Sequence, residues 1–370
     1  MTTVLHIAPF DASKYPPLLN TVRVSAARGI RSVVVASVPL AARDAVPTPE
    51  VVAPARVRGG AAQLTFLAAA GARLVRSFRP DLVVGHNMRG LGVASLLPTR
   101  APLVYHCHDF EHANAWIPRV EWAASLRATE VWVPAEERRD RAAALGLRAP
   151  VRVVENCPVR MGELPAPGRL RRWLASEGVP NADTVPIVLR HGGIGRSQCI
   201  LETVETLPQL PRGTVFVVVG EGGGAYRERC IARAAELGVG DRLRFHPFVS
   251  HGELWELLVD ATVGMTLYAP TGPNAAAPAP NKVYECMAAG VPVVVTHGNS
   301  IARMVEASGA GLSVPVDVAR LTDALRTFIV DDALRKLMGS AAREAHLARY
   351  HYESELAPTI FGALSASTAS

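Results

Sequence analysis

Short runs of apolar, mostly β-branched residues alternate with amphipathic stretches along the whole chain. The short runs predict buried strands, and the stretches between them predict helices. The first half gives strands at Val4–Ala8, Ser32–Ala36, Leu82–Gly85, Leu103–His106, Glu130–Val133 and Val151–Val154. Helices are predicted between them at Leu18–Arg28, Ala61–Phe78, Arg119–Arg127 and Glu136–Leu145. This β-α-β-α order predicts an α/β fold with a parallel, doubly wound sheet.

The alternation stops over Cys157–Asp183, where four prolines and several glycines stand close together, and then begins again. The second series of strands is Val185–Arg190, Thr214–Val219, Arg242–His246, Thr262–Leu267, Val291–Thr296 and Leu312–Val314. Helical patterns follow at Val316–Ile329, Asp332–Arg349 and Ser354–Leu364.

Two successive α/β domains follow from this order. We expect an N-terminal domain over 1–160, a linker over 161–184, a C-terminal domain over 185–348, and a terminal helix and tail over 349–370. A cleft between two such domains is a usual place for a ligand. The length of 370 residues also favours two hydrophobic cores over one.

Composition narrows the class of protein. Apolar residues make up 49% and charged residues 19%, which argues against disorder and against a coiled coil. The five cysteines are scattered without a C-x-x-C pair, so we expect reduced thiols in a cytoplasmic protein. We expect no signal peptide, since the first ten residues carry no lysine or arginine, and no membrane span, since no apolar run approaches about 20 residues.

The net charge of +6 is unevenly distributed. Residues 1–185 hold 23 Lys and Arg against 15 Asp and Glu, whereas the remainder holds 16 against 18. A basic N-terminal half favours an acidic partner, either a phosphorylated acceptor or an anionic membrane surface at the inner face. An arginine-rich surface without such a partner is an equal alternative.

The strongest motif is the run PNKVYECMAAGVPVVV over 280–295. Pro280 suits a helix start, and Gly290 with Pro292 ends the helix. Lys282 and Glu285 are three residues apart and share one face. A lysine in the first helical turn opposes the helix dipole, and a bound diphosphate would remove this conflict. The alternative is an exposed Lys–Glu pair.

Two glycine-rich loops precede this motif. The first, RHGGIGR over 190–196, follows a strand and leads toward a helix, so its backbone N–H groups and Arg196 are suited to an anion. The second, VGEGGG over 219–224, has the same setting. Neither is a P-loop or a G-x-G-x-x-G fingerprint. Each alone could be an ordinary βα turn, but all three segments lie at carboxyl ends of strands, where open α/β sheets bind ligands.

In this order and spacing, the three motifs resemble those of retaining GT-B glycosyltransferases of family 4, in the subgroup with a P-N-K-x-x-E signature. The resemblance covers 190–296 closely and the rest loosely. It implies two Rossmann-like domains facing a cleft, with a C-terminal helix that crosses back to the N-terminal domain. It implies a donor that is a nucleotide-diphosphate sugar, UDP- or GDP-linked, and no other cofactor. The acceptor would be a small molecule, a glycan or a lipid-linked hydroxyl; nothing indicates nucleic acid.

The resemblance also assigns residues. The expected catalytic residues are His108, beside the donor sugar, and Arg196 and Lys282, on the donor diphosphate. The expected nucleotide-binding residues are Gly193 and Gly220, where the backbone approaches the donor, Phe248 and Val249, which flank the base, and Glu285, which holds the ribose. A buried core position is the alternative for His108 and is favoured for His106.

The sequence departs from the family pattern in places. Ala277 stands eight residues before Glu285, where many relatives have a glutamate that contacts the sugar. PFDAS over 9–13 replaces the usual Gly-Gly loop after the first strand. No D-x-D motif lies in a suitable loop; Asp109-Phe110-Glu111 is the nearest, so we expect no metal at the diphosphate, where two cations could stabilise the leaving group.

Two other functions remain open on the sequence. A GT-B nucleotide-sugar epimerase would need several catalytic carboxylates and histidines, and only His108, Asp109 and Glu111 cluster in the sequence. A non-catalytic transferase-like subunit is favoured by Ala277 and opposed by Arg196, Lys282 and Glu285. The leading expectation is a glycosyltransferase that acts with retention and without metal.

Overall fold

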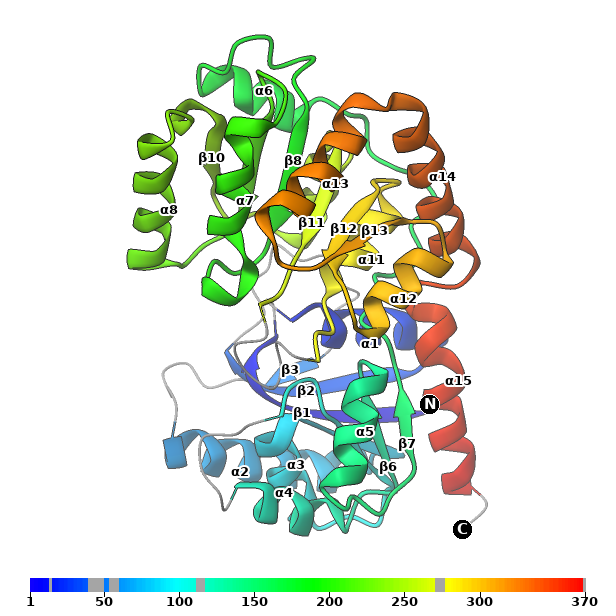
Figure 1. Ribbon diagram of the computed structural model, residues 1–370. Helices are drawn as coiled ribbons and strands as arrows, with labels where there is room; N and C mark the ends of the chain where they lie inside the picture. Colours follow the sequence, from blue (N-terminus) through cyan, green and yellow to red (C-terminus); the bar gives the residue numbers. More distant parts are fainter. Residues whose placement is uncertain (13–14, 39–49, 53–59, 111–116, 270–276, 369–370) are drawn as a thin grey trace. The chain divides into compact units, whose positions relative to one another are not determined.

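A computed structural model of the chain describes residues 1–12, 15–38, 50–52, 60–110, 117–269 and 277–368. Its contacts divide the chain into two compact units (Figure 1). The first consists of Met1–Val159 together with Tyr352–Ser370, and the second consists of Arg160–His351. Each is built on one parallel sheet, which confirms the predicted pair of α/β units.

The first unit has a seven-stranded sheet in the order β3-β2-β1-β4-β5-β6-β7. Its strands are β1 (Thr3–Asp11), β2 (Arg31–Val38), β3 (Glu50–Val52), β4 (Leu82–His86), β5 (Leu103–His106), β6 (Glu130–Val133) and β7 (Val151–Val153). All of the neighbouring strands pair in parallel. The order reverses between β1 and β4, as in a doubly wound sheet.

Helices cover both faces of this sheet. On one face, α2 (Gly60–Phe78), α3 (Asn87–Ser95), α4 (Ile117–Ser125) and α5 (Glu136–Ala144) pack through an apolar cluster that contains Leu67 and Leu91. On the other face lie α1 (Pro16–Ala26) and α15 (Tyr352–Thr368). The alternation of side chains along each strand assigns neighbouring residues to opposite cores.

The C-terminal helix belongs to the first unit, as the sequence predicted. Tyr352, Leu356 and Ile360 of α15 are buried against β1, β4, β5 and β6. The hydroxyls of Tyr352 and Thr21 are 2.9 Å apart, and the Tyr352 backbone N–H donates to the carbonyl oxygen of Pro158 at 2.8 Å. The last helix therefore completes the hydrophobic core on one face of the first sheet.

The second unit has a six-stranded parallel sheet in the order β10-β9-β8-β11-β12-β13. Its strands are β8 (Ile187–His191), β9 (Val215–Val219), β10 (Leu243–His246), β11 (Val263–Thr266), β12 (Val293–Thr296) and β13 (Gly311–Val314). Its helices are α6 (Arg169–Ser176), α7 (Ile200–Thr206), α8 (Gly224–Glu236), α9 (His251–Leu258), α11 (Asn281–Ala288), α12 (Ser300–Ala307), α13 (Val318–Val330) and α14 (Asp332–Ala348).

One face of the second sheet packs against α7, α8 and α13 in a single apolar cluster. On the opposite face, α11 lies directly against β11. A Cβ built on Gly264 of β11 would stand 2.5 Å from the sulfur of Cys286, so glycine permits this close approach. The helix that carries Lys282 and Glu285 is thereby fixed on the sheet.

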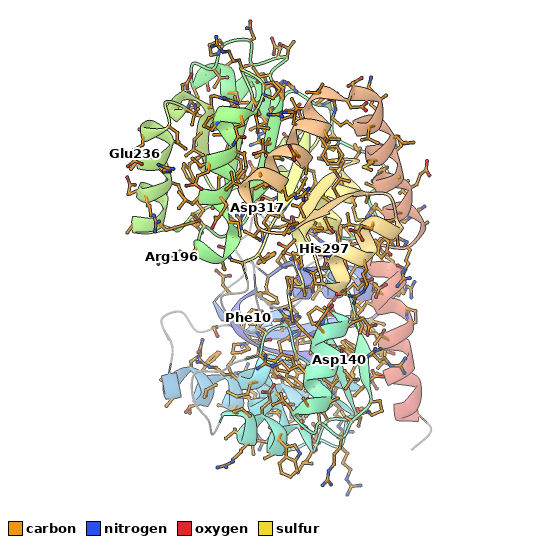
Figure 2. All side chains as sticks on the ribbon, in the orientation of Figure 1. Phe10, Asp140, Arg196, Glu236, His297 and Asp317 are labelled. Carbon is orange, nitrogen blue, oxygen red and sulfur yellow. The ribbon has the colours of Figure 1, made fainter. Side chains whose placement is uncertain are left out.

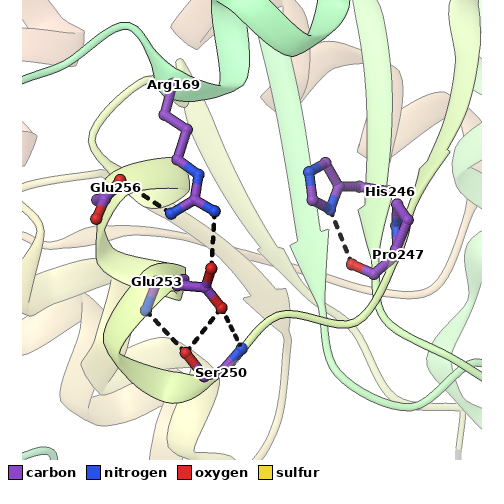
Figure 3. Close-up of polar contacts among 6 residues, drawn as sticks. All are labelled: Arg169, His246, Pro247, Ser250, Glu253 and Glu256. Carbon is purple, nitrogen blue, oxygen red and sulfur yellow. Dashed lines mark hydrogen bonds and ion pairs between the residues drawn. The ribbon is translucent and has the colours of Figure 1, made fainter. Parts of the chain in front are cut away.

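The segment 161–184, which we expected to be a linker, is part of the second unit and contains α6. Asp260, whose side chain is fully buried, accepts from the backbone N–H groups of Gly168 at 2.7 Å and Leu170 at 2.8 Å. Arg169 also binds Glu253 and Glu256 of α9, and Glu253 forms a capping box with Ser250 (Figure 3). Acceptors that lie about 90 residues further along thus stabilise the start of this helix.

No helix in the described ranges combines the length and apolarity needed to cross a bilayer.

Candidate functional site

Three segments of the second unit meet at the carboxyl edge of its sheet: the loops after β8 and β9, and the start of α11. The backbone N–H of Gly192 donates to the carbonyl oxygen of Val219 at 2.9 Å, which joins the two loops. Ile194 and Gly222 form a further parallel bridge between them. The sequence prediction that these motifs converge is confirmed within this unit.

Glycine is required where the two loops touch. Gly220 has a φ of 149°, and a Cβ at this position would stand 2.3 Å from the carbonyl oxygen of Gly192. Any side chain here would force the loops apart. Gly220 therefore sets the separation between the two glycine-rich loops.

Lys282 lies over the first loop. It is the second residue of α11, as the sequence predicted. A Cβ on Gly192, whose φ is 94°, would stand 2.5 Å from Lys282 Cε and 2.9 Å from Nζ. The ammonium forms no ion pair or hydrogen bond with any described residue. Lys282 is thus a half-buried cation without a described partner, at the start of a helix and beside the backbone of the first loop. Such a position is suited to binding an anion.

Arg196 is the second unpaired cation of this edge. Its exposed side chain projects outward (Figure 2) and forms no ion pair within the described ranges. The helix expected directly after the loop is interrupted: residues Arg196–Gln198 form a 3-10 turn, Cys199 has a φ of 52°, and α7 begins only at Ile200. The left-handed residue separates the loop from the α-helix, so Arg196 heads a tight turn and not a continuous helix.

Arg190 holds the first loop from beneath. Its side chain is almost completely buried at the end of β8, and Nη1 donates to the carbonyl oxygen of Gly193 at 3.0 Å. Gly193 itself is exposed, and nothing lies within 4 Å of the position of its missing Cβ. The loop therefore has a fixed underside and an open outer backbone.

Glu285 is buried beneath the loops and is held by two histidines. Its Oε2 lies 2.7 Å from His191 Nε2, and its Oε1 lies 2.9 Å from His251 Nε2. Only 4% of the residue is exposed. The alternative of an exposed Lys282–Glu285 pair is wrong, because the carboxylate turns inward to these partners.

The pKa of Glu285 follows from this setting. Burial acts to raise the pKa, but hydrogen bonds from His191 and His251, with their electrostatic attraction, outweigh it and hold the pKa well below its ordinary range. The pKa of His191 is lowered, chiefly by burial; Glu285 acts to raise it, whereas Lys282 and Arg190 act to lower it. Glu285 is therefore an anion that accepts N–H groups from imidazoles.

The remaining residues assigned to nucleotide binding immediately precede α9, the helix that carries His251. Phe248 and Val249 follow β10 and precede α9, whose first residue is His251. Phe248 is 51% exposed, which is unusual for a large aromatic side chain, and Val249 is half-buried. An exposed aromatic ring three residues before His251, which binds Glu285, offers a surface on which a base could stack.

His108 lies in the first unit, just beyond β5, and is 4% exposed. The backbone N–H groups of His108 and Asp109 donate to Asn87 Oδ1 at 2.8 and 3.1 Å. Asn87 has a φ of 55°, and Arg138 Nη1 contacts the carbonyl oxygen of His108. This turn is held in one conformation, and His106 beside it is fully buried, as expected.

Some sequence expectations lie outside the described residues: Glu111, Ser13, and the part of the loop before α11 at 270–276.

Sequence reasoning missed His191, His251 and Arg190 as members of the site. His191 and Arg190 belong to the first glycine-rich motif. Their position at the end of a strand could have indicated that they contribute to the site. His251 is 34 residues from Glu285 in sequence, and no local pattern joins them.

Comparison with known proteins bears on both units. The profile of glycosyl transferases group 1 matches residues 180–345. The profile described as Glycosyltransferase Family 4 matches residues 18–157. The chain is a GT-B glycosyltransferase. No curated protein sequence matches it.

Solved structures share the fold of this glycosyltransferase at low sequence identity. Anabaena HepE in complex with UDP-glucose has a TM-score of 0.80 and 20% identity, over 98% of this chain and 100% of that one. Sucrose-phosphate synthase from Thermosynechococcus elongatus has a TM-score of 0.79 and 19% identity, over 100% of both chains. A glycosyltransferase from Rickettsia africae has a TM-score of 0.78 and 15% identity, over 98% of both.

Proposed function

We propose that this glycosyltransferase moves a sugar from a UDP- or GDP-linked donor to an acceptor hydroxyl, with retention of the anomeric configuration and without a metal at the diphosphate. The observation that carries the proposal is that two cations, Lys282 and Arg196, have no partner among the described residues and lie at an edge where two glycine-rich loops expose their backbone. A diphosphate brings about two negative charges, which these side chains can balance.

The nucleoside is proposed to lie beside Glu285. Each oxygen of a carboxylate can accept more than one hydrogen bond, so Glu285 can hold a ribose diol while it keeps His191 and His251. Phe248 and Val249 would flank the base. We favour uridine over guanosine because HepE has been solved with UDP and with UDP-glucose.

Retention is proposed on the resemblance to family 4. In that route the acceptor hydroxyl attacks from the face that the diphosphate leaves, and a departing phosphate oxygen takes its proton. Lys282 and Arg196 would stabilise the charge that develops on the leaving group. His108 would lie beside the sugar. Ala277 cannot supply a carboxylate, so sugar recognition would use other groups.

The acceptor is proposed to meet the N-terminal half, whose excess of basic residues suits a phosphorylated or lipid-linked molecule at an anionic membrane surface. Flotation with vesicles containing anionic lipid, at low and high salt, would test the surface contact. Binding that is equal for neutral and anionic vesicles would contradict it.

The central experiment is a donor scan followed by product analysis. Purified protein is titrated calorimetrically with UDP, GDP, TDP and ADP, and the best nucleotide is retested with EDTA and with Mg²⁺. We expect binding that survives EDTA. Labelled sugars on that nucleotide are then offered with simple acceptors, and proton NMR of the product assigns its anomer. An inverted product, or binding that only Mg²⁺ restores, would contradict the corresponding part of the proposal.

A further inference from the structure

Four histidines meet inside the first unit: two end the adjacent strands β4 and β5, one lies within the neighbouring strand β1, and one follows β5. His86 ends β4, His106 ends β5, and the two are direct partners in the parallel register. His6 of β1 pairs with Val84, two residues before His86, so all three strand residues share one face of the sheet. His108 follows two residues after His106. All four are buried, and His108, the most exposed, reaches 4%.

The ring nitrogens of this cluster are poorly satisfied. Within the described ranges, both nitrogens of His106 lack a hydrogen-bond partner, as do Nδ1 of His108 and Nε2 of His6. A neutral imidazole always carries one N–H donor and one lone pair, so His106 buries both without a partner. Buried polar groups are normally satisfied, and such an exception calls for an unseen partner. No carboxylate among the described residues binds any of the four rings.

The geometry fits a metal ion as that partner. One ring nitrogen from each of His86, His106 and His108 can be chosen so that all three lie within 4.8 Å of one another. His86 Nδ1 and His108 Nε2 are already 3.0 Å apart. Zinc–imidazole bonds of about 2.0–2.1 Å place tetrahedral ligand nitrogens about 3.3 Å from each other, close to the His86–His108 separation, and binding would draw His106 to the same distance.

His6 supplies the orienting contact that metal-binding histidines usually have. Its Nδ1 lies 3.1 Å from His86 Nε2. If His86 Nε2–H donates to His6, the lone pair of His86 is left on Nδ1, the atom that faces His108. The hydrogen bond thus selects the tautomer that a metal ion needs.

We propose that His86, His106 and His108 bind one divalent transition-metal ion inside the first unit, with His6 as the positioning residue of His86. Three neutral imidazoles suit Zn²⁺, and a fourth position is left for water or an anionic group. Every proposed ligand lies in the first unit, whereas Lys282 and Arg196, the proposed diphosphate residues, belong to the second. The proposal does not depend on the donor or on the acceptor.

Metal binding is tested on the full chain with any histidine tag removed. Metal-free protein is prepared by dialysis against a chelator and titrated with ZnCl₂ and with CoCl₂. We expect one ion per chain by elemental analysis, a higher melting temperature, and the intense visible absorption of tetrahedral Co²⁺. X-ray absorption of the zinc-loaded wild type should show imidazole nitrogens at about 2.0 Å. A wild type that takes up no stoichiometric ion, or whose zinc has no imidazole ligands, would overturn the proposal.

Variants then assign the ligands. His106→Gln should abolish the Co²⁺ spectrum, whereas His6→Gln should keep it and weaken affinity about 10- to 100-fold. His346→Gln is the matched control, since His346 is fully buried but belongs to the second unit; its spectrum should equal that of the wild type. An unchanged spectrum in His106→Gln would refute the assignment. A variant that fails to fold does not decide the assignment. The wild-type measurement uses no substitution, so it can refute the proposal in that case as well.

Discussion

The side chain of Lys282 lies so close across Gly192 that a methyl group at position 192 would collide with it, at 2.5 Å from Cε. The two residues are 90 positions apart, and their contact joins the first glycine-rich loop to the start of α11. Lys282 therefore owes its position to the absence of a side chain on Gly192.

Gly192→Ala should weaken both the fold and nucleotide binding. The φ of 94° is unfavourable for alanine, and the new methyl displaces Lys282, so we expect a loss of about 1–3 kcal/mol in the free energy of unfolding and weaker UDP binding. Urea unfolding and calorimetry measure the two effects.

Gly193→Ala is the control, because its Cβ would meet nothing within 4 Å. It should leave stability unchanged and lower UDP affinity less than Gly192→Ala does, because it leaves Lys282 in place. Wild-type UDP affinity in Gly192→Ala would contradict the role of the contact.

Lys282→Ala and Arg196→Ala should each lower affinity for a nucleoside diphosphate. Removing one partner of a desolvated charged contact costs about 2–5 kcal/mol, which is roughly 30- to 4,000-fold in binding. The free nucleoside should bind almost as to the wild type, because it has no phosphate. Calorimetric titration with UDP and uridine separates these cases, and Lys336→Ala on the exposed face of α14 serves as control. Equal UDP affinity in wild type and Lys282→Ala would refute the diphosphate assignment.

Glu285→Ala should weaken UDP and uridine alike, because its proposed partner is the ribose. It should also lower the free energy of unfolding by about 2–5 kcal/mol, because the buried His191 and the partly buried His251 both lose the acceptor of their N–H groups. Glu236→Ala, which breaks an exposed pair with Arg233, should stay within about 1 kcal/mol of the wild type. Thermal and urea unfolding supply the stabilities. An Ala variant that kept uridine affinity would remove Glu285 from the nucleoside site.

Stability should fall on mild acidification because of His191. Its pKa in the folded protein lies below its ordinary value of 6.5, so below about pH 6.5 the unfolded chain takes up a proton that the folded chain does not. One such group changes the free energy of unfolding by up to about 1.4 kcal/mol per pH unit. This stability is lost as the pH falls from 6.5 to the pKa of His191 in the folded protein. Urea unfolding between pH 7.5 and 5.5 should show a smaller slope for His191→Gln than for the wild type. Identical slopes would show that His191 does not titrate in this way.

Most of the fold could be predicted from the strands, because parallel strands that are buried on both faces appear in the sequence as continuous apolar runs. Leu103–His106 and Glu130–Val133 begin and end where the sequence predicted. The three-residue strand β3 was missed, since so short a run has no period to detect. Helix α6 was missed because prolines surround it and its first N–H groups are satisfied by Asp260, which no local pattern reveals.

Some features of the candidate site could likewise be predicted from the sequence, and others could not. Lys282 and the glycine-rich loops could be predicted because strand ends of one parallel sheet must share an edge. The inward turn of Glu285 could not, because it depends on His251, which the chain brings in from the start of α9. The histidine cluster of the first unit escaped notice for a related reason: the register of His86 and His106 exists only in the folded sheet.

Because α15 returns to the first unit, the second unit is an insertion within the first. This arrangement affects the order in which the two units can fold during translation. The core against β1 and β4 stays open on one side until residues 352 onward leave the ribosome. At about 5–20 residues per second, translation of 160–351 imposes a delay of roughly 10–40 s, during which the continuous second unit can fold first. A nascent first sheet therefore keeps the part of this face that α15 will cover exposed to solvent for that interval.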